Sequence, residues 1–124
     1  MKTDISHNME FFNALENSLK QYRRMANAKL EHTGIQITLD QWQVLDIIVN
    51  FAHITQAEIA AKTSKDTASI TRIIGILNSK GWVARQTDPE NRRKLILKVS
   101  HPGEKEYYRA AEVISKFSIA AVEG

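Results

Sequence analysis

The sequence predicts a mainly α-helical fold with one small β-hairpin (α+β). Two short amphipathic helices are expected at 55–63 and 66–80, separated by a tight break. Two short alternating segments, 82–87 and 95–99, follow them and are joined by a turn. A helix pair followed by a hairpin is the layout of a winged helix-turn-helix, here flanked by longer helices at both ends of the chain.

Size and composition indicate a single soluble domain spanning residues 1–124. The chain is 43% apolar and 25% charged, which is ordinary for a globular protein. It has no cysteine, so disulfides, thiol redox sensing and cysteine nucleophiles are excluded. No apolar run approaches the roughly 18 residues of a membrane span, and the acidic N-terminus does not resemble a secretory signal. We therefore expect a soluble cytoplasmic protein with no membrane contact and no cofactor.

The first helix is predicted from about Ser6 to His32, with Gly34 marking its end. Its apolar residues recur every three or four positions and trace one stripe: Ile5, Met9, Phe12, Leu15, Leu19, Tyr22 and Ala26. Such a long helix is unusual in a small monomer. We expect the stripe to pack both on its own domain and on a partner helix.

Capping signals predict the next three helices. Thr38 with Gln41, and Thr55 with Glu58, form T-x-x-Q/E capping boxes, and Asp66 is a good N-cap. Gly81 is a natural residue just past the end of the last of these helices. Their expected buried residues are Trp42, Leu45, Ile48 and Val49, then Ile59 and Ala60, then Ile70, Ile73, Ile74 and Leu77.

The hairpin is predicted as a strand over 82–87, turn residues Asp88 to Asn91, and a return strand over 95–99. Arg92, Arg93 and Lys94 are expected at its tip. A final helix begins after Ser100, a predicted N-cap, with Pro102 in its first turn. Its broad apolar face comprises Tyr107, Tyr108, Ala111, Ile114, Phe117 and Ala121.

Charge and side-chain size point to nucleic acid as the partner. Residues 38–100 hold nine Lys or Arg and six Asp or Glu, so this segment carries all of the net charge of +3. The polar face of the helix at 66–80 has small residues and one arginine, which suits entry into a DNA groove. An arginine on a hairpin suits the narrow minor groove. The predicted DNA-contacting residues are Lys65, Thr67, Ala68, Ser69, Thr71, Arg72, Arg92, Arg93 and Lys94.

The chain resembles the MarR family of bacterial transcription regulators. Five segments carry the resemblance in matching order and spacing: T-Q-x-E-I-A at 55–60, D-T-A-S-I-T-R at 66–72, L-N-S-K-G-W-V at 77–83, D-P-E-N-R-R at 88–93 and V-S-x-x-G at 99–103. The motifs cover about residues 37–103, and the two end helices match by pattern alone. The segment D-P-x-x-R-R after K-G-x-V-x-R is the most specific of them.

The resemblance implies a homodimer held by N- and C-terminal helices, here residues 1–36 and 101–124, with a winged-helix DNA-binding lobe at 37–100. It also implies a pseudo-palindromic operator, with the recognition helix in the major groove and the wing in the minor groove. The expected function is a transcriptional repressor relieved by a small aromatic or amphipathic ligand. Candidate ligand-lining residues are Phe12, Tyr22, Met25, Trp42 and Tyr108; plain core and interface packing is the alternative for each.

The chain departs from the family pattern in two places. Asn91 stands where the family usually has an aspartate that braces the wing arginine, so we expect a looser wing. The sequence ends at Gly124, where relatives commonly continue into a further helix of the dimer interface, so we expect an altered dimer geometry. The absence of cysteine excludes the peroxide-sensing branch of the family.

Two other readings stay open. A winged helix can serve protein–protein contact without specific DNA binding; the basic tip and the small-residue helix face argue against that use. A metal-sensing variant would use Glu16, Glu31 and His32, although scattered histidines are usually surface residues. No metal site is expected. An enzyme is not expected either, because the sequence has no H-x-x-x-H pair and no glycine-rich phosphate loop.

Overall fold

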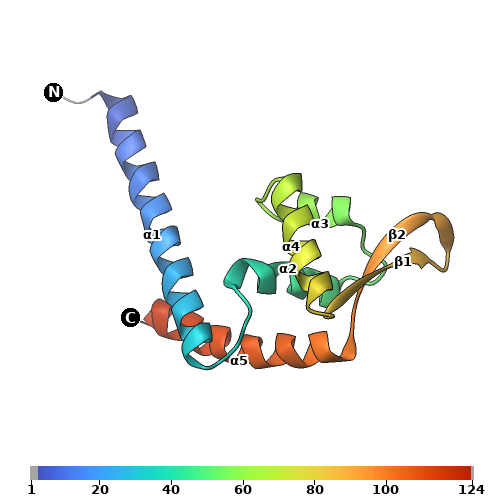
Figure 1. Ribbon diagram of the computed structural model, residues 1–124. Helices are drawn as coiled ribbons and strands as arrows, with labels where there is room; N and C mark the ends of the chain where they lie inside the picture. The colour runs from blue at the N-terminus through green and yellow to red at the C-terminus, as the bar shows by residue number, and fades with distance from the viewer. Residues whose placement is uncertain (1–2, 124) are drawn as a thin grey trace.

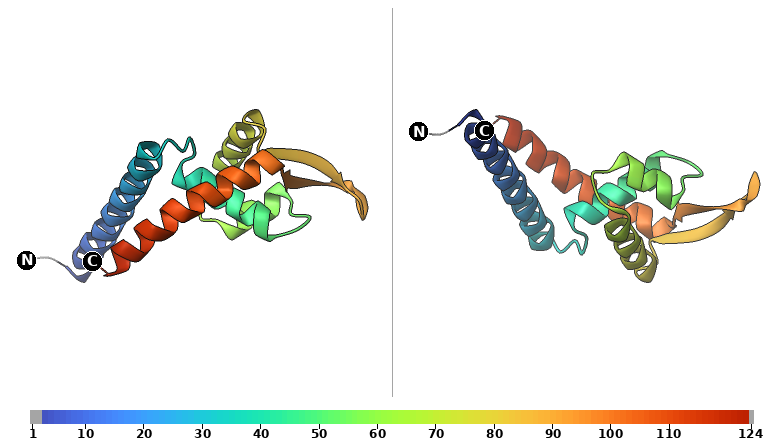
Figure 2. Two further views of the ribbon diagram at one scale, coloured as in Figure 1. Left: turned by 90° about the horizontal axis from the view of Figure 1, so that it is seen from below. Right: turned by 90° about the horizontal axis from the view of Figure 1, so that it is seen from above.

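The chain folds into five helices and one two-stranded antiparallel hairpin in a computed structural model that describes the backbone of residues 3–123 and the side chains of residues 3–116. The order is α1 (Asp4–His32), α2 (Leu39–Asn50), α3 (Gln56–Lys62), α4 (Thr67–Ser79), β1 (Val83–Asp88), β2 (Asn91–Val99) and α5 (His101–Glu123) (Figure 1). Helices α2, α3 and α4 form a lobe with the hairpin. The hairpin projects at the end of the molecule opposite α1 in every view (Figures 1 and 2).

The predicted caps set the helix starts. Both capping boxes form: the Thr38 and Thr55 hydroxyls each accept the N–H three residues on, from Gln41 and Glu58, whose side chains bond back. The Asp66 carboxylate accepts the Ser69 N–H at 2.7 Å. These bonds satisfy N–H groups that have no partner inside the helix, so each boundary is determined locally.

The lobe has a dry apolar core. Leu45 from α2, Ile59 from α3 and Leu77 from α4 are fully buried. The rest of the predicted α4 face, Ile70, Ile73 and Ile74, is buried as well. The core cluster also contains Val44, Ile48, Ile54, Ile70, Ile73, Ile74, Val83 and Leu97. Burial of such side chains stabilises a fold by about 1.5–3 kcal/mol each relative to exposure. The same cluster includes Ala26 and Leu30 of α1 and Ala110 and Ile114 of α5, so the lobe shares its core with parts of the two long helices.

The return strand starts earlier than the sequence indicated. It begins at Asn91, which pairs with Asp88, whereas the next pair is Thr87 with Leu95. One step along β1 thus corresponds to four along β2, and the extra residues are Arg92, Arg93 and Lys94. The three basic residues were expected at the tip of the hairpin; they lie beside the turn, which is Pro89–Glu90, and form a bulge on β2.

Ser100 and Gly103 join the wing to α5. The Ser100 Oγ accepts the Gly103 N–H at 3.1 Å, which confirms the predicted N-cap, and its own N–H donates to the Trp82 carbonyl at 2.9 Å. A Cβ at Gly103 would collide with that same carbonyl oxygen and lie 2.9 Å from Val99 Cγ2. The V-S-x-x-G segment is therefore explained by this close approach of α5 to the start of β1.

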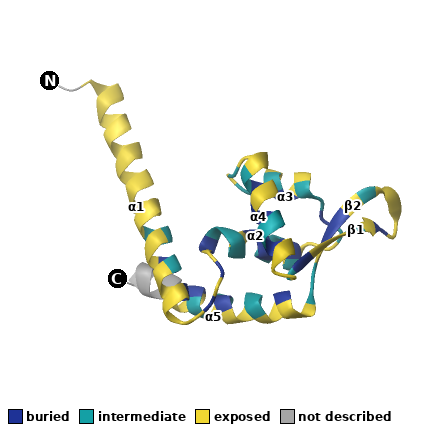
Figure 3. Ribbon diagram, viewed as in Figure 1, coloured by how far each residue is buried: buried dark blue, intermediate teal, exposed yellow. Residues whose placement is uncertain are grey.

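Helix α1 stands away from the lobe as an arm. Only its C-terminal part is covered, where Ala26 and Leu30 are buried, and the rest is exposed along its length (Figure 3). Gly34, with φ +80°, follows the end of the helix as expected. The stripe residues from Ile5 to Leu19 are 47–75% exposed. On α5, Phe117 and Ala121 lie outside the residues whose side chains are described.

Polar and aromatic contacts of α2 connect the arm and α5 to the lobe. The Asp40 carboxylate of α2 receives Arg23 of α1 at 3.0 Å and Lys65, just before α4, at 3.2 Å. On the other side of α2, the Trp42 and Tyr107 rings stack at 5.4 Å, and the Tyr107 hydroxyl donates to Asp46 at 2.6 Å. Partial burial, then the bond to Asp46, raises the Tyr107 pKa. Within the described residues no helix is long and apolar enough to cross a membrane.

Candidate nucleic-acid interface

The polar face of α4 presents short side chains to solvent. Thr67, Ala68, Thr71 and Arg72 are exposed, and Ser69 is half-buried. The Thr71 hydroxyl donates to the Thr67 carbonyl at 2.9 Å and accepts from the Gln56 amide of α3 at 2.5 Å. The short side chains give this face little bulk, as a helix that enters a groove requires. The two hydrogen bonds restrict the rotamer of Thr71.

Gln56 is a site residue that sequence reasoning missed. Its amide fixes the Thr71 rotamer from the neighbouring helix, 15 positions earlier in the chain. No local pattern carries this information, because the contact depends on how α3 crosses α4.

The predicted basic residues fall into two groups. Within the part of the chain that the structure describes, the Arg72, Arg92 and Arg93 guanidinium groups are exposed and make no hydrogen bond or ion pair. Lys65 and Lys94 are half-buried and engaged: Lys65 with Asp40 at 3.2 Å, and Lys94 with Glu58 at 3.7 Å and Asp88 at 4.0 Å. The arginines are thus available for an anion, whereas the lysines hold elements of the lobe together.

Asp88 organises the wing. It is 3% exposed, and one carboxylate oxygen accepts the Glu90 N–H at 2.9 Å and lies 2.9 Å from His53 Nδ1. The bond from Glu90, followed by that from His53, lowers the Asp88 pKa. Asn91, expected to be a weak brace, accepts only the backbone N–H of Arg93 at 3.1 Å. The buried carboxylate of this wing is therefore Asp88.

The five candidate ligand-lining residues do not share a cavity. Phe12 is 54% exposed on the arm, and Tyr108 is 64% exposed beside Tyr107. Trp42 and Tyr22 pack against the core. Met25 alone of the five lines an open, mostly apolar groove of about 980 Å³ between α1 and α5. Within one chain these residues are spread out, since Phe12 lies about 20 Å away from Met25 along α1.

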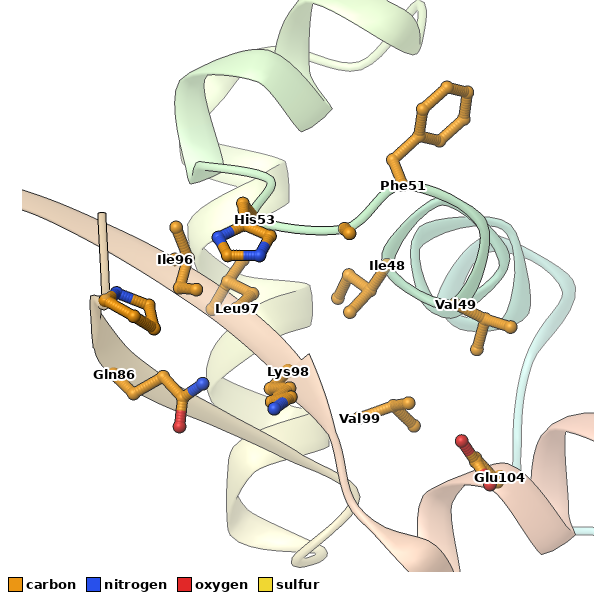
Figure 4. Close-up of a pocket in the computed structure, with 12 residues that line it drawn as sticks. Ile48, Val49, Phe51, His53, Gln86, Ile96, Leu97, Lys98, Val99 and Glu104 are labelled. Atoms are coloured by element: carbon orange, nitrogen blue, oxygen red, sulfur yellow. The ribbon is translucent and has the colours of Figure 1, made fainter. Parts of the chain in front are cut away.

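A second hollow lies behind the wing, between the end of α2, the hairpin and the start of α5 (Figure 4). It holds about 290 Å³, and its lining includes Ile48, Val49, His53, Gln86, Lys98 and Glu104. The described part of α1 does not line it.

Comparison with known proteins identifies the lobe. The MarR family profile matches residues 37–95. YwoH of Bacillus subtilis, an uncharacterised HTH-type transcriptional regulator, is 28% identical over 110 residues, which cover 89% of this chain and 78% of YwoH. The Escherichia coli multiple antibiotic resistance protein MarR is 35% identical over 69 residues, which cover 56% of this chain and 48% of that protein.

Solved structures of the family superpose on the whole fold. A mutant of E. coli MarR in complex with operator DNA gives a TM-score of 0.77 at 25% identity, covering 91% of this chain and 79% of that one. CouR from Rhodococcus jostii, solved with p-coumaroyl-CoA, gives a TM-score of 0.81 at 22% identity, covering 99% of this chain and 84% of the CouR chain. The profile, the relatives and the shared fold agree: residues 37–95 match the MarR family, and the chain has the fold of its winged helix-turn-helix proteins.

Proposed function

We propose that this chain is a dimeric, sequence-specific double-stranded DNA-binding protein that represses transcription in the bacterial cytoplasm. Helix α4 enters the major groove and the β1–β2 wing reaches the adjacent minor groove. The observation that carries the proposal concerns Arg72 on α4 and Arg92 and Arg93 on the wing of a MarR-family lobe: among the described residues their guanidinium groups are exposed and make no hydrogen bond or ion pair, as is also true of Arg85 on β1. No enzymatic activity is part of it.

On α4, Arg72 supplies a long hydrogen-bond donor, and its short neighbours let the helix approach the groove closely. Arginine forks to the O6 and N7 atoms of guanine or to a phosphate, and the threonine hydroxyls of Thr67 and Thr71 bond to either class of acceptor. Ala68 can contact a thymine methyl. Gln56 acts by positioning Thr71.

On the wing, the bulge turns Arg92 and Arg93 out of the regular strand pairing. A narrow minor groove concentrates negative potential and attracts such side chains. Lys94 braces the wing against α3 through Glu58. We therefore assign Lys65 and Lys94 to holding the lobe, in place of the direct DNA contact that the sequence suggested.

The dimer is proposed from the exposed stripe on α1. Large apolar side chains from Ile5 to Leu19 are solvent-exposed in the single chain. A soluble monomer rarely leaves a contiguous apolar patch of this kind open. A second copy packed on the arm would cover it and would set two α4 helices on one face of DNA, which produces a palindromic site. We also propose that the groove containing Met25 admits a small aromatic or amphipathic ligand that weakens DNA binding.

The first test is selection from a random duplex DNA library by the purified full chain at near-physiological salt. We expect an enriched palindrome whose half-sites lie about one helical turn apart. Binding without a motif that collapses as salt rises would contradict sequence-specific recognition. It would instead favour use of the winged helix for protein contact.

Single-residue variants then measure how much each arginine contributes to binding of the selected duplex. Arg72→Ala and Arg93→Ala should each weaken binding by about 1–3 kcal/mol. Arg24→Ala is the matched control, because it removes the same charge from an exposed position on α1, outside the lobe. Equal affinities for Arg93→Ala and the control would remove the wing from the mechanism.

A further inference from the structure

We propose that His53, Asp88 and Glu90 form a binding site for a divalent transition-metal ion of the Zn²⁺ type, at the junction of the wing and the loop between α2 and α3. The nitrogen of His53 and one oxygen from each carboxylate all lie within 4.8 Å of one another. The sequence indicated no metal site here, since His53 and Asp88 are 35 residues apart. The inference concerns metal binding alone and stands whether or not the chain binds DNA.

Backbone structure fixes His53 beside the wing. Its φ of +59° is a left-handed conformation, which turns the chain after α2. The next residue, Ile54, accepts the Leu97 N–H through its carbonyl at 2.9 Å, so the loop is bonded to β2. Figure 4 shows the imidazole ring beside Ile96 and Leu97 at the rim of the hollow behind the wing. The His53 ring is thus carried on a loop whose backbone is hydrogen-bonded to β2.

The hairpin turn presents the two carboxylates. Asp88, the last residue of β1, is buried, and its Oδ1 lies 2.9 Å from His53 Nδ1. Glu90, in the turn, is exposed and can adjust, while its backbone N–H donates to the same Asp88 oxygen. The site therefore combines two preset ligand groups with one adjustable one.

The distances suit a metal. Zinc binds histidine nitrogen and carboxylate oxygen at about 2.0–2.2 Å, so neighbouring ligand atoms in a tetrahedral site lie about 3.3–3.6 Å apart. The His53–Asp88 separation of 2.9 Å needs to open by about 0.5 Å, and the exposed Glu90 approaches by a rotamer change. One imidazole and two carboxylates leave a fourth position for water, a ligand set that suits zinc and related divalent ions.

The local charge favours a dication. Lys94 lies 3.7 Å from Glu58 and 4.0 Å from the second oxygen of Asp88. With His53 neutral, Glu58, Asp88, Glu90 and Lys94 together carry a net charge of −2, which a divalent ion cancels. Lys94 approaches Asp88 Oδ2, whereas Oδ1 faces His53 and also accepts the Glu90 N–H. Bound metal would tie the wing turn to the loop before α3.

The test uses the full chain, purified without an affinity tag and stripped with a chelator. Titration with Zn²⁺ alone, followed by calorimetry or a competing indicator, should give one ion per chain. His53→Asn and Glu90→Gln should each lower the affinity at least tenfold. Asparagine tolerates the left-handed backbone and keeps a donor for Asp88, so circular dichroism should show an unchanged fold for His53→Asn.

His101→Asn and Glu112→Gln are the matched controls, because they change the same residue types at exposed positions on α5. They should bind Zn²⁺ as the parent does. Two results would overturn the site: no binding at 100-fold excess of Zn²⁺ over protein, or binding that His53→Asn and Glu90→Gln leave unchanged. The second result would place the ion elsewhere on the chain.

Discussion

The winged-helix lobe and the α1 arm use apolar residues in opposite ways. In the lobe, Ile70, Ile74 and Leu77 of α4 are 0% exposed. On the arm, Ile5 is 75% and Leu19 is 55% exposed, although the spacing of the stripe is just as regular. Helical periodicity therefore identifies a face that is to be buried, but it does not say by what. The face of α4 is buried within the chain, whereas the chain leaves the stripe from Ile5 to Leu19 exposed, and we propose that a second copy covers it.

Breaking the lobe should have the largest effect on folding. Leu77→Ala removes a fully buried side chain from the core and should lower the free energy of unfolding by about 2–5 kcal/mol. Denaturant titration at several protein concentrations measures it. Leu19→Ala on the arm is the control, and its effect should appear only through dimerisation. A similar loss from Leu19→Ala in a dilute monomer would contradict the distinction between the two regions.

Breaking the arm should change assembly and leave the lobe folded. Leu15→Glu places a charge in the middle of the stripe, so the dimer dissociation constant should rise at least 100-fold, or about 2.7 kcal/mol. Asn17→Glu adds the same group two residues further along, off the stripe. Sedimentation equilibrium separates the two variants. If both shifted assembly equally, net charge rather than the stripe would control it.

The contact between the wing and α5 can be tested at Gly103, with Gly75 of α4 as the comparison. Gly103→Ala forces a Cβ against the Trp82 carbonyl and should cost about 1–3 kcal/mol of stability. Gly75→Ala in α4 meets nothing within 4 Å and should raise stability by up to about 1 kcal/mol. Thermal unfolding of both variants shows whether each substitution lowers or raises the stability. A stable Gly103→Ala protein would mean that α5 can move off the wing without cost.

The weakest predicted effect lies at the link between the two regions. Asp40→Asn removes the carboxylate shared by Arg23 of the arm and Lys65 of the lobe. Because these groups are partly exposed, the loss of stability should be at most about 1 kcal/mol. Denaturant titration should show this small change with an unchanged dimer mass. A loss above about 2 kcal/mol would show that the link is a main support of the arm.

Local signals predicted most of the lobe. The capping boxes at Thr38 and Thr55 and the cap at Asp66 fixed three helix starts, because each involves residues three apart. The start of β2 was missed because residues 92–94 bulge at a point that alternation cannot reveal. The His53–Asp88 and Gln56–Thr71 contacts were missed because they depend on packing between distant segments.

The same limit explains the basic residues. A sequence counts Lys65, Lys94 and the arginines alike as positive charges. Only the fold reveals that Asp40, Glu58 and Asp88 neutralise the two lysines, whereas Arg72, Arg92 and Arg93 stay unpaired among the described residues. That these arginines contact DNA is part of the proposed function.

The most direct test of the account is the mass of the protein–DNA complex on the selected duplex, measured by native mass spectrometry. The account predicts two chains of 14.1 kDa on one duplex for the parent protein, and loss of that species for Leu15→Glu. A single chain bound to the duplex with full affinity would contradict it, because the exposed stripe on α1 would then need no second copy.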